Sequence, residues 1–172
     1  MGVPGVAVMF ESAASHEEVM TGPSGDFSMG VAPGSWELVP HKMGSEVSAV
    51  DVADAVAVLE ASVGMIAMTE PLALAGDVSG DGRVTAYDAA LIMRRAAGNP
   101  QTFPATTACG SDWVFFPTAV NMPNQAVTQP ALNAGTCTAG AVSYQPLSGS
   151  AEGQDFAAVL LGDFDNSWLP NP

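Results

Sequence analysis

The feature that most constrains this chain is an acidic, glycine-containing loop that leads into a helix. It reads Asp77-Val-Ser-Gly-Asp-Gly-Arg-Val-Thr-Ala-Tyr-Asp88, and an apolar run ending at Gly98 follows it. Gly82 stands at the sixth loop position, where a calcium loop needs a sharp turn. A ligand set made only of oxygen atoms suits calcium better than zinc or copper. The sequence therefore predicts a calcium site with the ligands Asp77, Ser79, Asp81, Arg83 through its carbonyl oxygen, Thr85 through its side chain or a water, and Asp88.

The same stretch, from Asp77 to Gly98, resembles a type I dockerin repeat. In that family the twelfth loop position is Asp, as Asp88 is here, and the helix that precedes an EF-hand loop is missing. The resemblance implies a calcium-folded module that docks onto other proteins, namely cohesins, in extracellular assemblies. Ala86 and Tyr87 depart from the family, which commonly has a Ser/Thr pair at these positions.

Residues 45–64 look like a degenerate partner of this repeat, because Val47-Ser-Ala-Val-Asp51 parallels Val84-Thr-Ala-Tyr-Asp88. We expect a helix that has a capping box at Ser48 and Asp51 and ends near Gly64. The loop before it lacks the acidic alternation, so this half binds either no calcium or calcium held weakly through Ser45, Glu46, Asp51 or Asp54. One apolar stripe is expected on the helix, made of Val52, Val56, Leu59 and Val63.

Residues 1–40 are predicted to form β-strands, because apolar residues alternate along three segments separated by Gly- and Pro-containing turns. The alternating residues are Val6, Val8 and Phe10, then Phe27 and Met29, then Trp36 and Leu38. These segments are similar to carboxypeptidase-regulatory-like and collagen-binding B-type β-sandwich repeats, which implies an immunoglobulin-like module of a secreted or surface protein. Such modules usually carry one more strand ahead of the first segment, so we expect either a trimmed chain or an open sheet edge.

Residues 101–172 are predicted to complete or extend that sandwich. The candidate strands are Trp113–Phe116, Val142–Tyr144 and 155–161. Asp163 and Asp165 lie one residue apart and form a weaker candidate metal site, although a polar turn that caps the last strand is the favoured explanation. Cys109 and Cys137 have no Cys-x-x-Cys spacing and no histidine cluster nearby, which favours a disulfide in an oxidising compartment over a zinc site.

The charge balance excludes several classes of partner. Eighteen acidic residues against four basic ones give a net charge of −14, which repels phosphate backbones and anionic lipid. No apolar run reaches the ~20 residues of a membrane span, so neither nucleic acid nor membrane insertion is expected. The chain also lacks recognisable catalytic motifs, and we predict no enzyme activity. The start of the chain has no basic signal-peptide segment, so it looks like the mature form of a bacterial-type secreted protein.

The predicted fold class is mostly β with a small α part: an immunoglobulin-like β-sandwich plus a dockerin-like, calcium-bound helix pair. Sandwich strands occupy residues 1–40, the helix pair 41–100, and a C-terminal β segment 101–172. The predicted function is that of a non-catalytic, calcium-stabilised extracellular structural protein. Its partners would be copies of itself, joined into a filament by strand donation. The alternatives are docking onto a cohesin and binding of a polysaccharide, with Trp36, Trp113 and Trp168 as stacking platforms.

Overall fold

The computed structural model describes residues 2–44 and 47–169. The chain is mostly β, with a multi-stranded antiparallel sheet, and divides into two compact units. Unit 1 comprises Met1–Lys42, Phe115–Pro130 and Ala139–Ala158, and unit 2 comprises Met43–Val114, Ala131–Thr138 and Val159–Pro172. The predicted boundary at residue 40 lies close to the first division, whereas the predicted segment 101–172 contributes to both units.

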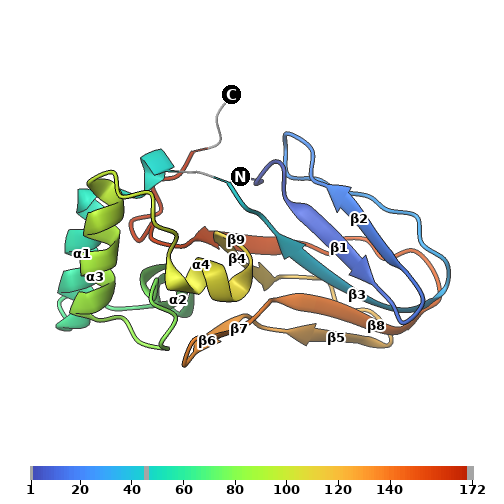
Figure 1. The fold of residues 1–172 in the computed structure, drawn as a ribbon. Coiled ribbons are helices and arrows are strands. Elements are labelled where there is room, and N and C mark those ends of the chain that lie inside the picture. The colour runs from blue at the N-terminus through green and yellow to red at the C-terminus, as the bar shows by residue number, and fades with distance from the viewer. Residues whose placement is uncertain (1, 45–46, 170–172) are drawn as a thin grey trace. The chain divides into compact units, whose positions relative to one another are not determined.

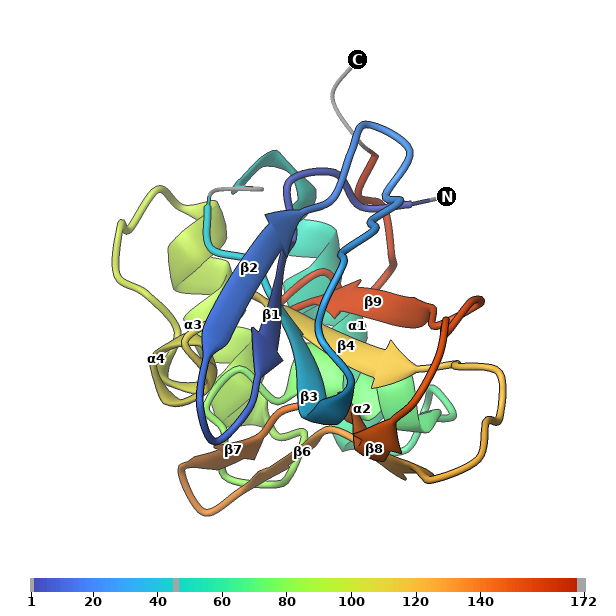
Figure 2. The same ribbon diagram turned by 90° about the vertical axis from the view of Figure 1, so that its right-hand side faces the viewer.

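Unit 1 is built on a five-stranded sheet with the strand order β2-β1-β3-β8-β5, in which every pair of neighbours is antiparallel (Figures 1 and 2). The sheet brings the start of the chain together with residues more than a hundred positions later, since β3 pairs with β8. Its strands are β1 (Ala7–Glu11), β2 (His16–Met20), β3 (Gly34–His41), β5 (Gln125–Thr128) and β8 (Ala141–Leu147).

One face of this sheet forms the core of unit 1. Phe10 lies opposite Leu38 on the neighbouring strand, and Leu38 lies opposite Val142 on the next. Trp36 lies opposite Tyr144, and all five side chains are buried. The alternation in the sequence thus predicts the buried face correctly, because side chains two apart along a strand point the same way.

The predicted strand at Phe27 and Met29 belongs to no sheet. Residues 26–32 run without a turn or bend, and no strand pairs with them within the described residues. Burial nevertheless alternates along this segment: Phe27, Met29 and Val31 are half-buried, and the residues between them are exposed.

Unit 2 contains the helices and a small hairpin. Its helical elements are η1 (Val47–Ala49), α1 (Val52–Ser62), α2 (Glu70–Gly76), α3 (Ala86–Ala96) and α4 (Pro104–Cys109), and its hairpin is β6 (Ala131–Asn133) with β7 (Thr136–Thr138). Helices α1 and α3 pack against each other. Strand β4 (Trp113–Pro117) pairs with β9 (Phe156–Leu160), and the division between the units falls within both strands.

The start of α1 differs from the prediction. Asp51 is the N-cap and accepts a hydrogen bond from the Ala53 amide, while Asp54 completes the capping box by accepting from the Asp51 amide. The capping box is therefore formed by Asp51 and Asp54 instead of Ser48 and Asp51, because Ser48 lies in the preceding 3-10 turn. The C-terminal end of α1 lies close to the predicted position. Val63 is the C-cap, and Gly64 follows with a positive φ that favours glycine.

The apolar stripe on α1 does not face the core. Val52, Val56, Leu59 and Val63 are 51%, 46%, 47% and 67% exposed, whereas Val58 between them is fully buried. The buried face consists of Ala55, Val58 and Ala61, whose small side chains allow α1 to approach α3 closely. The larger apolar residues are left on the outer face of the helix.

The predicted disulfide is present. Cys109 at the end of α4 is joined to Cys137 in β7, with a sequence separation of 28. The bond fastens the β6–β7 hairpin to α4 within unit 2, and no free cysteine remains.

Candidate metal centres

The loop that begins at Asp77 wraps around the carboxylate of that residue. Asp77 is buried at the C-terminal end of α2, and its Oδ1 accepts hydrogen bonds from the amides of Gly80 (2.9 Å) and Asp81 (3.1 Å). Its Oδ2 accepts from the Gly82 amide at 2.8 Å. Gly80 and Gly82 both have positive φ, which an L side chain rarely adopts, so the two glycines allow the turn that aims these amides inward.

Asp88 closes the same loop from the first turn of α3. Its Oδ2 accepts hydrogen bonds from the amide and the hydroxyl of Thr85, which is the N-cap of the helix. Its Oδ1 accepts from the Ser79 amide at 2.9 Å. The buried Asp88 side chain thus joins the third position of the loop to the helix that follows it.

The β6–β7 hairpin covers this loop. The amide of Gly135 donates to the Gly80 carbonyl at 2.8 Å, and the amide of Ala134 donates to the Asp81 carbonyl at 3.4 Å. A Cβ added to Gly82 would lie 3.3 Å from the carbonyl oxygen of Leu132, so the hairpin and the loop are in close contact. Because Cys137 anchors the hairpin through the disulfide, the loop is supported from outside as well as by its own hydrogen bonds.

The acidic residues of this loop differ in burial. Asp77 and Asp88 are buried, whereas Asp81 is exposed and its carboxylate accepts a hydrogen bond from the Arg83 amide. The three carboxylates do not form a group whose ligand atoms all lie within 4.8 Å of one another. The remaining predicted ligands, Ser79 and Thr85, direct their hydroxyls to Asp77 and Asp88.

A second acidic cluster brings together residues far apart in the sequence. Within residues 2–44 and 47–169, Asp54, Asp163 and Asp165 are the only three acidic, histidine or cysteine side chains with ligand atoms all within 4.8 Å of one another. Asp54 comes from the first turn of α1, and the other two come from the loop after β9. Asp54 and Asp163 are buried and Asp165 is exposed, so the cluster could hold a metal ion near the protein surface.

The second cluster repeats the hydrogen bonds of the first loop. Oδ1 of Asp163 accepts from the Ser167 amide and Oδ2 from the Trp168 amide, four and five residues later. Asp77 accepts in the same way from Asp81 and Gly82, which are also four and five residues later.

The carboxylates in the first turns of α1 and α3, Asp54 and Asp88, also accept corresponding hydrogen bonds. Oδ1 of Asp54 accepts from the amides of Phe164 (2.8 Å) and Asp165 (3.1 Å), and its Oδ2 accepts from the Asp51 amide. In the first loop, Oδ1 of Asp88 accepts from the Ser79 amide and its Oδ2 accepts from the Thr85 amide. Residues 163–168 therefore correspond to the first half of the loop at 77–82, and Asp54 takes the part that Asp88 takes in the first loop.

The environment of these carboxylates disfavours negative charge. Burial raises the pKa of Asp54 to about 6, and repulsion from Asp165 and Asp163 adds to the effect. Burial also raises the pKa of Asp77, assisted by the negative charge of Asp88. The pKa of Asp163 is raised by burial and by its neighbour Asp165. A bound divalent cation would offset this cost directly, since an opposite charge favours the ionised form of a carboxylate.

The sequence predicts Asp163 and Asp165 as one candidate site and Asp54 as a weak ligand of the degenerate repeat, but it does not join Asp54 to the other two. Of the residues predicted to bind calcium with Asp54, Ser45 and Glu46 lie outside the described residues. Asp51 serves as a helix cap. Both turns begin with Gly-Asp, at Gly76-Asp77 and at Gly162-Asp163, but the same dipeptide at Gly25-Asp26 and Gly80-Asp81 makes this a weak signal.

Two of the three tryptophans lie in the core, and the third is half-buried. Trp36 and Trp113 are buried, and Trp36 donates its indole N–H to the Ala32 carbonyl. Trp168 packs edge-on against Trp113, with the ring centroids 4.7 Å apart. Trp36 and Trp113 therefore offer no ring face to a sugar in solution.

Comparison of the chain with protein-family models, with curated proteins and with solved structures finds no match. Among the described residues, no helix is both long and apolar enough to cross a bilayer.

Proposed function

We propose that this protein is a non-catalytic, calcium-stabilised extracellular assembly protein that associates with copies of itself through the exposed face of α1. Two calcium sites stabilise unit 2 in this proposal. The first is the continuous loop from Asp77 to Asp88, and the second is the split loop formed by Asp54 with residues 163–168. Support comes from the donor chemistry, because both sites offer carboxylate, hydroxyl and carbonyl oxygens, the ligands that calcium prefers.

The resemblance to a dockerin pair gains support from the matched hydrogen bonds of the two loops. In this proposal the helix pair is dockerin-like, with its first loop supplied by the end of unit 2 instead of by residues upstream of α1. Unit 1 is the immunoglobulin-like part, with Phe10, Leu38 and Val142 in its core. The disulfide fits an oxidising location outside the cytoplasm.

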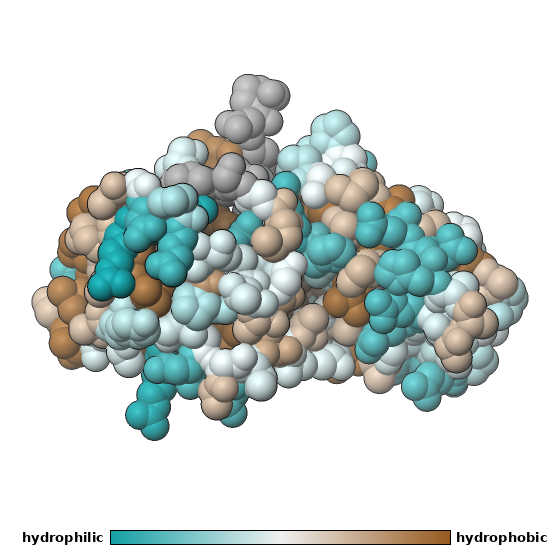
Figure 3. All heavy atoms as spheres, in the orientation of Figure 1, coloured by the Kyte–Doolittle hydropathy of each residue, from teal (hydrophilic) through white to brown (hydrophobic). Residues whose placement is uncertain are grey.

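The observation that carries self-association is the stripe of half-exposed apolar residues on α1. Its members are spaced by four, three and four residues, which is the spacing of a seam between two packed helices. Apolar side chains gather on the side of unit 2 where α1 lies (Figure 3). A helix with this spacing fits another helix, and α1 of a second copy presents the same seam.

The expected strength of this contact is low. Burying the exposed half of each such side chain contributes roughly 1 kcal/mol, so the eight side chains of two paired α1 faces supply about 8 kcal/mol, which the association cost of about 4–15 kcal/mol largely offsets. A single pair of α1 faces is therefore too weak for a tight dimer. It suits a concentration-dependent assembly in which many copies gather.

Sedimentation velocity across a wide range of protein concentration, in calcium and in chelator, tests the proposal. Val56→Gln with Leu59→Gln should weaken self-association by about tenfold or more, because two apolar contacts are lost. The matched control, Met20→Gln with Val127→Gln, changes two apolar residues of unit 1 that are also exposed and should have no effect. A chain that stays monomeric at all concentrations in calcium would overturn self-association and leave the calcium sites to be judged by calorimetry.

Docking onto a cohesin is the second candidate, and the dockerin-like loop is the observation that favours it. Capture by a panel of immobilised cohesins separates the two proposals. Calcium-dependent capture that competes with self-association would assign α1 to a cohesin. Capture by none of the panel, together with concentration-dependent assembly, would support the first proposal.

A further inference from the structure

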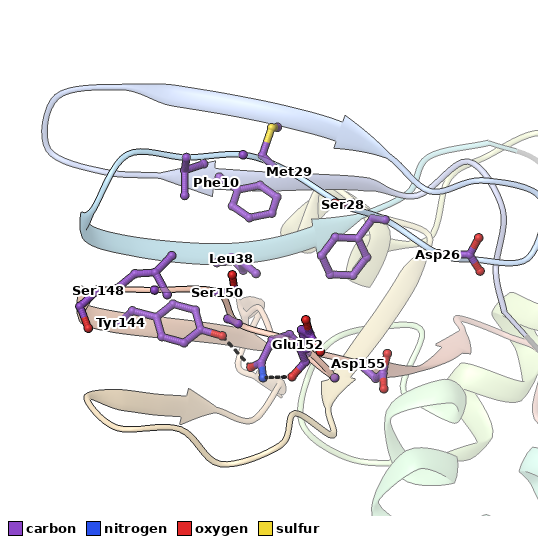
Figure 4. A pocket seen from close by; sticks show the side chains of 18 of the residues that line it. Phe10, Asp26, Ser28, Met29, Leu38, Tyr144, Ser148, Ser150, Glu152 and Asp155 are labelled. Atoms are coloured by element: carbon purple, nitrogen blue, oxygen red, sulfur yellow. Dashed lines mark hydrogen bonds between the residues drawn. The ribbon is translucent and has the colours of Figure 1, made fainter.

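Unit 1 holds a cavity of about 710 Å³ over the buried face of its sheet. Phe10, Leu38 and Tyr144 from the sheet line it, together with two segments that belong to no sheet, Phe27–Val31 and Ser148–Ala151 (Figure 4). A cavity of this size is within the range that holds ligands.

The first of these segments behaves like a strand that lacks a partner. Phe27, Met29 and Val31 are half-buried and alternate with exposed residues, as side chains of a strand do. Within the described residues, the backbone amides and carbonyls of Phe27–Val31 and of Ser148–Ala151 make no hydrogen bond. Unpaired backbone groups on an extended segment are a template for the addition of a further strand.

One wall of the cavity is fixed in place before anything binds. The Tyr144 hydroxyl donates to the side-chain oxygen of Gln154 at 2.6 Å. The amide nitrogen of Gln154 then donates to the carbonyls of Glu152 (2.8 Å) and Val120 (3.1 Å). These bonds hold residues 152–154 over the sheet, so a ligand need not order that wall itself.

The rim of the cavity is acidic. Asp26, Glu152 and Asp155 line it, and all three are exposed. They form no ion pair within the described part of the chain. An apolar floor with an acidic rim is complementary to a ligand that combines apolar side chains with positive charge.

We propose that this cavity binds an extended, basic peptide strand of a partner protein. The strand runs along Phe27–Val31 and takes up its unpaired backbone groups. Its alternate apolar side chains enter the cavity towards Phe10 and Leu38, and its Lys or Arg side chains meet the acidic rim. Five residues of extended chain span about 17 Å, which sets the length of the contact.

A strand lent by another copy of this chain is the less favourable occupant. The chain carries a net charge of −14 and only four basic residues. Most segments of a second copy would therefore be repelled by the acidic rim. The proposal does not rest on the calcium sites or on the face of α1, since every residue that it uses lies in unit 1.

The test uses the full chain in calcium and a fluorescein-labelled hexapeptide that alternates leucine or valine with lysine. Fluorescence anisotropy should show saturable binding that weakens as salt is raised. Replacing Asp26, Glu152 and Asp155 by Asn, Gln and Asn should weaken binding by about tenfold. The matched control replaces Glu17, Glu18 and Glu37, three exposed acids of the sheet, by Gln and should bind as the wild type does.

Two further measurements separate strand addition from general attraction to an acidic protein. A peptide with N-methyl groups on alternate amides should bind at least tenfold more weakly, because it cannot complete the hydrogen-bonded ladder. Hydrogen exchange at the amides of residues 27–31 should slow when the lysine peptide binds. Three results would each overturn the proposal. They are equal binding by the rim variant and the control variant, unchanged hydrogen exchange at residues 27–31, and no binding of the lysine peptide at low salt. Saturable binding of a peptide copied from this chain in preference to the lysine peptide would also overturn it.

Discussion

At the scale of single residues, the two loops depend on carboxylates that lie where helices begin. Asp88 and Asp54 each occupy the third position of a helix and complete a capping box. Each also accepts a hydrogen bond from an acidic or polar loop segment, through Ser79 in one case and Asp165 in the other. One side chain therefore fixes the helix start and the loop together.

Asp77→Asn tests the continuous loop. The substitution preserves size but removes the charge around which the loop amides are arranged, so one calcium ion should be lost. If both proposed sites bind calcium, calorimetry should show one bound ion fewer in the variant than in the wild type, with a smaller rise of Tm on adding calcium. Two ions bound by the variant would contradict the assignment.

Asp54→Asn tests the split loop, with Asp51→Asn as its control. Both residues lie at the start of α1, and asparagine caps helices as well as aspartate does. The Asp54 variant should lose one bound calcium and part of the calcium-dependent rise in Tm. The Asp51 variant should keep both, because Asp51 serves only as the N-cap. An Asp51 variant that lost calcium equally would assign the effect to the helix end in general.

At the scale of elements, α1 shows why periodicity alone could not orient a helix. Its apolar residues cover more than one face, so the stripe at Val52, Val56 and Leu59 competes with the one at Ala55 and Val58. The smaller stripe is buried because small side chains let α1 lie close to α3. The sequence predicts the helix and its end well, but the choice between two apolar faces depends on the neighbouring element.

The substitutions Val58→Ala and Val56→Ala test which apolar face of α1 is buried. Val58 is fully buried, so its truncation should lower the free energy of unfolding by about 2 kcal/mol. Val56 is half-exposed, and its truncation should change the free energy by no more than about 0.5 kcal/mol. Urea denaturation of both variants at low protein concentration is the measurement. Equal losses would show that the outer face of α1 is covered in the isolated chain.

The sheet and the loops differ in how far sequence could predict them. Apolar alternation predicts β1, β3 and β8, because each has a buried face with period two. Strands β2 and β5 carry mostly exposed residues and have no such signal. The short helices α2 and α4 also lack a periodic pattern, since each makes only about two turns. The residues of the continuous loop are contiguous, so the sequence alone can propose them as one site, whereas the split loop needs the fold to bring Asp54 to Asp163.

At the scale of the whole molecule, stabilising bonds are unevenly shared. Both candidate metal centres and the disulfide lie in unit 2, and unit 1 has none of them among the described residues. The β6–β7 hairpin of unit 2 has strands of only three residues, so it depends more on these constraints than the five-stranded sheet of unit 1 does.

Removing the disulfide should show this difference. A bridge that closes a loop of this length contributes about 3 kcal/mol on the chain-entropy model, so Cys109→Ser with Cys137→Ser should lower stability by that order. Hydrogen exchange should speed up mainly in β7, α4 and the loop at 77–88 that the hairpin covers. Faster exchange in β1, β3 and β8 to the same extent would show that the two units unfold together.

The split loop makes the order of synthesis matter. Asp54 and Asp165 are 111 positions apart, so the chain cannot assemble this site until residues 163–168 have been made and released. Closing so long a loop is slow, and the start of α1 must wait without its loop partner until then. A proteolytic cut between β9 and residue 168 would in turn free the Asp54 carboxylate at the start of α1 from the amides of Phe164 and Asp165 that it now accepts from.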